Sequence, residues 1–160
     1  MSFNFFLHYL LFGCNKYEEI EKKLNFAFPN YVKCSVVKVI NGNTFNCQFP
    51  DIQIERVKLI GVKIPNSFKQ EAADFSGSYL RRGLPVKLEF DLERYDDINI
   101  FAYVYLPGDK MLNALLIEKG FAEYKANSPN VKHEKYLLSL QEKAKDQRRG
   151  IWGESRLKSE

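Results

Sequence analysis

The stretch YVKCSVVKVI-NGNTFNCQFP-DIQIERVKLI, residues 31–60, holds the pattern that decides the fold. Its first ten residues are rich in β-branched side chains, Asn41-Gly42 follows them, and a second apolar segment continues to residue 49. An Asn-Gly pair between two such segments is the usual signal of a two-residue type I′ hairpin. We therefore predict two antiparallel strands, at 31–40 and 44–49, joined at Asn41-Gly42.

A third strand is predicted over residues 52–60, after a turn that contains a proline. Apolar Val57 and Leu59 alternate there with charged Arg56 and Lys58. Alternation with a period of two is the pattern of a half-buried strand. Three consecutive strands of this kind predict a meander.

The rest of the chain supplies helices and two further strands. Helices are predicted over 66–82, 111–119 and 131–148, and strands over 86–91 and 98–106. The order β-β-β-α-β-β-α-α is typical of an OB-fold. We predict a mainly β protein with α, built as a five-stranded OB-fold β-barrel with about three packed helices.

Length and composition describe an ordinary globular chain. It has 160 residues, 45% of them hydrophobic, which suits one domain with a real core. The formal net charge of +4 arises from many charges of both signs, so a polyanionic partner is permitted but not demanded. The longest apolar run is well short of the roughly 20 residues that span a bilayer, which argues against an integral membrane protein.

The three cysteines, Cys14, Cys34 and Cys47, do not have the CxxC spacing of a zinc or thioredoxin-like site. An odd number also argues against a disulfide scaffold. In the predicted hairpin Cys34 pairs with Phe49, so Cys34 and Cys47 are diagonal neighbours, normally too far apart for a disulfide. We expect two free, buried thiols, although a slipped register could link them in an exported protein.

Residues 1–14 form an apolar segment that ends in Leu-Phe-Gly-Cys, and they resemble a bacterial lipoprotein signal. In that interpretation Cys14 receives a lipid that holds the mature chain on a membrane. The bulky Phe12 and the absence of Lys or Arg before it count against export. The alternative is an apolar segment docked on the domain with Cys14 as a buried thiol. Membrane contact is expected only through such an anchor, and both an exported and a cytoplasmic location stay open.

The chain is thus divided into four segments. The apolar segment 1–14 precedes a charged and then aromatic tether, residues 15–30, and residues 154–160 form a polar tail that we expect to be flexible. The predicted barrel domain occupies residues 31–153.

Residues 31–153 resemble a staphylococcal-nuclease domain along their whole length. The matching stretches are VVKVINGNT at 36–44, RVKLIGVKIP at 56–65, FAYVY at 101–105, LNALL at 112–116, GFA at 120–122, AK at 144–145 and GIW at 150–152. Their order and spacing, rather than any one of them, carry the resemblance. The resemblance implies an OB-fold barrel and a relationship to enzymes that hydrolyse phosphodiester bonds.

In active members, the resemblance implies, two aspartates hold a calcium ion and a glutamate near a loop proline acts on the attacking water. Two arginines neutralise the phosphate. Calcium prefers carboxylate and carbonyl oxygens, the water needs a base, and the developing negative charge needs fixed cations.

The matching positions of this chain carry other residues. Asn43 stands at the first metal-ligand position, Lys63 at the second, and Asn66 at the position of the base. The two arginine positions hold Lys58, which keeps a positive charge without the bidentate fork, and Asn99. These exchanges make the pocket about three charge units more positive at neutral pH. The resemblance therefore implies a degenerate member without calcium, other cofactors or the family's catalytic residues.

We expect a binding protein rather than an enzyme, with nucleic acid as the first candidate partner. Lys58 and Lys63 are the candidate phosphate-binding residues and Tyr124 is a candidate for stacking on a base. The alternative for both lysines is a solvated surface position.

Two other functions stay open: a protein-interaction or envelope-anchored structural domain, and a nuclease with a rearranged site. In the second, Asp96, Asp97 or Glu71 would act as metal ligand or base. His133 has no nucleophilic partner nearby, and we interpret it as a solvated surface residue. A monomer is expected.

Overall fold

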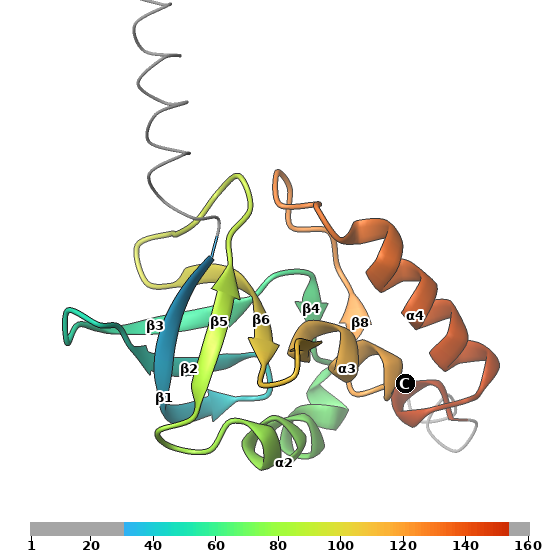
Figure 1. Ribbon diagram of the computed structural model, residues 1–160. Coiled ribbons are helices and arrows are strands. Elements are labelled where there is room, and N and C mark those ends of the chain that lie inside the picture. Colours follow the sequence, from blue (N-terminus) through green and yellow to red (C-terminus); the bar gives the residue numbers. More distant parts are fainter. Residues whose placement is uncertain (1–30, 154–160) are drawn as a thin grey trace, which may run out of the picture. The chain divides into compact units, whose positions relative to one another are not determined.

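The computed structural model describes residues 31–153 (Figure 1). The lipoprotein-type segment 1–14 with Cys14, the tether 15–30 and the tail 154–160 lie outside the described residues, so the predictions for them stay predictions. Within the described part, no helix is both long enough and apolar enough to cross a membrane.

Five strands form a closed barrel, which confirms the predicted fold class (Figure 1). Around the barrel the order is β3-β2-β1-β5-β6, and a parallel pairing between β3 and β6 closes it. The strands are β1 (Tyr31–Asn41), β2 (Thr44–Gln48), β3 (Ile54–Leu59), β5 (Pro85–Glu89) and β6 (Ile100–Leu106). The predicted meander of the first three strands is confirmed.

The three predicted α-helices are present and shorter than expected. They are α2 (Lys69–Tyr79), α3 (Leu112–Glu118) and α4 (Glu134–Asp146). A 3₁₀ turn, Asn66–Phe68, follows Pro65 and delays the start of α2. A second 3₁₀ turn is Gly150–Trp152, and three two-residue strands are β4 (Val62–Lys63), β7 (Lys110–Met111) and β8 (Glu123–Tyr124).

Buried side chains of the barrel and of α3 form one core. Its innermost side chains are fully buried: Phe45, Val57, Leu88, Val104 and Leu116. Such alternate inward-facing positions are what the strand pattern predicts.

A buried asparagine fastens α3 to the barrel. The Asn113 side chain accepts a hydrogen bond from the backbone N–H of Val104 (2.9 Å) and donates one to the backbone oxygen of Ile60 (2.8 Å). Because both bonds are buried, they satisfy backbone groups that water cannot reach. α3 then lies between the barrel and α4 (Figure 1).

The first hairpin differs from its predicted turn. Asn41 pairs with Thr44, so Gly42 and Asn43 are the turn residues, and Gly42 does not have a positive φ. The type I′ prediction is therefore wrong. Glycine is needed here for another reason, because a Cβ on Gly42 would lie 2.6 Å from the Cβ of Ala72 in α2.

The expectation of free thiols is also wrong, since Cys34 and Cys47 form a disulfide. Val36 pairs with Cys47, so the two cysteines are diagonal neighbours as predicted. However, β1 is not an ideal strand, because it has register shifts between Val36 and Lys38 and between Val39 and Asn41. The two Cα atoms lie 5.8 Å apart, well within the range for a disulfide.

A half-buried carboxylate joins the barrel to the start of α4. Glu89, with 15% of its side chain exposed, pairs with Lys132 Nζ at 2.6 Å and with His133 Nε2 at 2.8 Å. The hydroxyl of Tyr105 also donates to Glu89 (2.8 Å), and the His133 ring packs edge-on against Tyr103. His133 is thus partly buried in a network, not solvated as the sequence suggested.

This network lowers the pKa of Glu89. Burial raises the pKa, but hydrogen bonds from Lys132, His133 and Tyr105 together outweigh it, and the pKa falls from 4.5 to about 2. Since the folded-state pKa lies below the unfolded one, the stabilisation is present above about pH 4.5 and is lost as the pH falls toward about 2.

We expect Glu89→Gln to lower the free energy of unfolding at pH 7 by about 2–3 kcal/mol and to flatten its decline between neutral and acid pH. Urea unfolding at a series of pH values measures both effects. Glu142→Gln, at an exposed carboxylate paired with Lys145, is the control and should change little. An unchanged acid limb in Glu89→Gln would contradict the assignment.

Reduction should destabilise the barrel as well. Cys34 and Cys47 are 13 residues apart in sequence, and opening a loop of that size costs about 2–4 kcal/mol. We expect dithiothreitol to lower the free energy of unfolding of the wild type by that amount, and so to lower its urea midpoint, and to change neither quantity in the Cys34→Ala, Cys47→Ala double variant. Equal midpoints for the wild type with and without reductant would show that the disulfide does not stabilise the fold.

Candidate functional site

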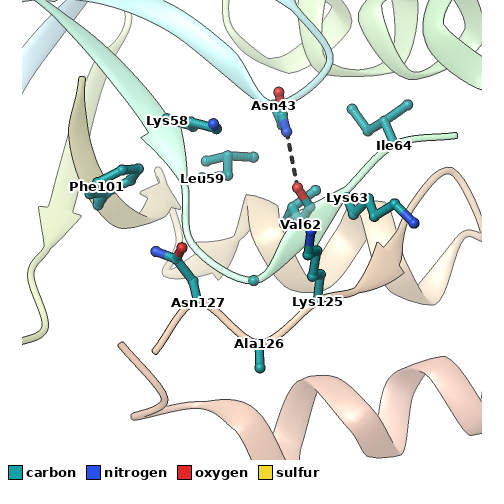
Figure 2. A pocket seen from close by; sticks show the side chains of 11 residues that line it. Asn43, Lys58, Leu59, Val62, Lys63, Ile64, Phe101, Lys125, Ala126 and Asn127 are labelled. Atoms are coloured by element: carbon teal, nitrogen blue, oxygen red, sulfur yellow. Dashed lines mark hydrogen bonds between the residues drawn. The ribbon is translucent and has the colours of Figure 1, made fainter. Parts of the chain in front are cut away.

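A pocket of about 310 Å³ opens beside the first hairpin (Figure 2). Its walls come from the β1–β2 turn, the end of β3 and β4, the start of β6 and the segment after β8. We call it the lysine pocket, because Lys58, Lys63 and Lys125 all line it.

Barrel closure brings these elements together. Lys58 in β3 pairs with Thr44 in β2 on one side and with Phe101 in β6 on the other. Lys58 therefore lies in the middle of the pocket wall, between the hairpin turn that carries Asn43 and the half-buried ring of Phe101. Two strands distant in sequence meet at this position.

Three of the predicted site residues line the same pocket: Asn43, Lys58 and Lys63. The structure adds Lys125 and Asn127, which the sequence did not single out. They follow β8, and only the antiparallel pairing of β8 with β4 carries that segment to the pocket.

Two other predicted residues lie outside the pocket lining. Asn66 is exposed in the 3₁₀ turn. Asn99 is held in its own loop, where its backbone N–H and its side-chain amide both donate to the carboxylate of Asp96. Hydrogen bonds from the backbone of Ile98 and of Asn99, with a smaller contribution from the charge of Lys58, lower the pKa of Asp96.

Tyr124 packs behind the pocket wall. Its hydroxyl donates to Glu134 of α4 (3.2 Å), and its ring lies against Gly61. Burial, followed by the charge of Glu134, raises the pKa of Tyr124 to about 12. Tyr124 therefore contacts α4 in the structure. Its role in base stacking stays a prediction.

The charges of the three lysines are balanced to different degrees. Lys63 forms an ion pair with Glu123 (2.5 Å), which reinforces the pairing of β4 with β8. Across residues 31–153, neither Lys58 nor Lys125 has a carboxylate within ion-pair distance. Two ammonium groups of the pocket are therefore available to an anion.

The oxygen donors that a calcium ion requires are scarce in the pocket. Calcium takes six to eight oxygen ligands, carboxylates prominent among them, whereas none of the residues lining the lysine pocket is acidic. Asp96, Asp97 and Glu71, the alternative ligands, belong to no cluster of three potential metal ligands within the described residues. The donor set does not fit calcium.

Comparison with known proteins identifies the class to which this barrel belongs. Residues 55–154 match the family model described as staphylococcal nuclease homologue. The chain belongs to that family. It is 35% identical over 127 residues to a thermonuclease of Staphylococcus intermedius, an alignment that covers 73% of this chain and 74% of the other protein.

The hairpin turn of the pocket depends on close contact with α2, and two glycines test this contact. A Cβ on Gly42 would also lie 2.8 Å from the backbone carbonyl carbon of Ala72, whereas one on Gly77 within α2 would meet nothing within 4 Å. We expect Gly42→Ala to lower the free energy of unfolding by about 1–3 kcal/mol. Gly77→Ala should raise it by about 0.5–1 kcal/mol, because alanine favours helix. Urea unfolding of both variants checks the pair, and a neutral Gly42→Ala would contradict the tight contact.

Proposed function

We propose that this domain binds the phosphate groups of nucleic acid in the lysine pocket and does not cut the chain. The observation that supports the proposal most directly is the pocket's charge, with three lysines and no acidic residue among the residues that line it. Lysine ammonium groups bind phosphate through their charge and by donating hydrogen bonds to its oxygens. Lys58 and Lys125, which have no ion pair within residues 31–153, are the principal contacts in this proposal.

The same residues argue against calcium-dependent hydrolysis. A divalent cation placed between lysines would be repelled by each of them, at a cost of several kcal/mol in a partly buried site. Asn66, at the position that the family resemblance assigns to the base, carries an amide, which does not take a proton near neutral pH. A neutral amide and a cationic pocket bind an anion without activating water.

The fold and the apolar wall of the pocket favour nucleic acid over a small inorganic anion. OB-fold barrels commonly hold single-stranded nucleic acid on their exposed strands. In this chain Phe101 offers a half-buried ring next to Lys58, so a base and its phosphate can contact neighbouring residues.

We expect Lys58→Ala combined with Lys125→Ala to weaken binding of single-stranded DNA by about 10- to 100-fold. The slope of log affinity against log salt should become shallower by about 1.4, the value for two lost phosphate contacts. Fluorescence anisotropy with a labelled oligonucleotide measures both. Lys119→Ala, at an exposed lysine outside the pocket, is the matched control.

The same preparation decides between binding and cutting. We expect no digestion of denatured DNA or RNA with calcium or with EDTA. Calcium-dependent digestion would establish a rearranged nuclease instead. Failure to bind any nucleic acid at low salt would contradict the proposal and favour a protein-interaction or envelope-anchored structural role.

A further inference from the structure

The side chain of Asn43 links two parts of the pocket that are distant in sequence. Its Nδ2 donates to the backbone oxygen of Val62 at 2.9 Å, shown as the dashed line in Figure 2, and its Oδ1 accepts from the hydroxyl of Thr44 at 3.1 Å. Both ends of the amide are therefore engaged within the protein.

The turn that carries Asn43 is fixed from its other sides as well. The hydroxyl of Ser76 in α2 donates to the backbone oxygen of Gly42 in a buried bond of 2.6 Å. The backbone oxygen of Asn43 accepts from the N–H of Leu59 (2.9 Å). The Asn43 side chain thus adds the contact to β4 that completes the attachment of the turn.

The type of side chain matters at this contact. A carboxylate at position 43 would place an acceptor against the Val62 carbonyl oxygen, which is also an acceptor, and the two would repel each other unless a positive group lay between them. The amide NH₂ of Asn43 supplies that positive group from within the side chain. No ion is needed to hold the turn against β4.

Lys63 adds a second link of the same kind. It follows Val62 in β4, and its ion pair with Glu123 fastens that strand to β8. The two sides of the pocket, the hairpin turn and the segment after β8, are consequently joined through β4 by the Asn43 hydrogen bond and the Lys63–Glu123 ion pair.

We propose that the amide of Asn43 positions the lysine pocket in place of a divalent cation, so that anion binding by this domain is independent of calcium. This inference rests on the proposed function for its ligand. Its structural part, a pocket assembled without metal, can be tested without any nucleic acid.

The first experiment measures thermal unfolding and needs no nucleic acid. We expect Asn43→Ala to lower the Tm by about 4–8 °C, and calcium to leave the Tm of the wild type and of the variant unchanged relative to EDTA. The matched control is Asn46→Ala, a half-buried asparagine on β2 that makes no side-chain hydrogen bond within the described residues. A calcium-dependent rise in the wild-type Tm, or equal shifts for both alanine variants, would overturn the inference.

The second experiment measures affinity at a temperature at which every variant is folded. We expect wild-type affinity for a labelled single-stranded DNA oligonucleotide to be equal in calcium and in EDTA. Asn43→Ala should bind at least about fivefold more weakly in both buffers, and Asn46→Ala should bind like the wild type. Wild-type binding that is lost in EDTA would refute calcium independence, and unaltered affinity in Asn43→Ala would refute a positioning role.

The two experiments separate this inference from the proposed function. If the wild type binds no nucleic acid while the Tm results are as expected, only the proposed function fails. If the wild type binds but Asn43→Ala behaves like Asn46→Ala in both assays, only the role of Asn43 fails.

Discussion

The parallel pairing of β3 with β6 is the contact on which the rest of the structure depends. Two strands separated in the chain by β4, α2 and β5 meet there, and the open sheet becomes a barrel. The pairing places Lys58 beside Phe101. The backbone N–H of Ile60 then donates to the oxygen of Ala102, just before the chain enters β4. Because no short-range pattern encodes such a contact, it follows only from burying the inward faces of all five strands together.

The parts predictable from sequence were those with a local cause. Alternation around Val57 and Leu59 predicted β3, and the ordered set of family-like stretches predicted the barrel. The failures had tertiary causes. The predicted type I′ turn requires a positive φ at Gly42, which is absent, and contact with Ala72 of α2 is what excludes a side chain there. The disulfide of Cys34 was missed because its Cα lies 5.8 Å from that of Cys47, closer than ideal strand geometry gives for diagonal neighbours. Lys125 reaches the pocket only through the pairing of β8 with β4.

The lysine pocket and the Glu89 network show the same chain treating charge in two ways. The Glu89 carboxylate accepts hydrogen bonds from Lys132, His133 and Tyr105. These bonds compensate its negative charge and join the start of α4 to the barrel. In the lysine pocket the excess charge is positive and is only partly compensated, by Glu123 at Lys63. Satisfied charges of the first kind stabilise a fold, whereas uncompensated charges gathered in a cavity are a mark of a binding surface.

The disulfide has one more consequence for the hairpin that carries Asn43. Cys34 lies on one arm and Cys47 on the other, so the turn between them belongs to a covalent ring. A protease that cleaved one peptide bond in the turn would leave both new chain ends attached to the barrel through sulfur. Cleavage at that place would therefore open the ring without dividing the molecule, and the two fragments would separate on a gel only after reduction.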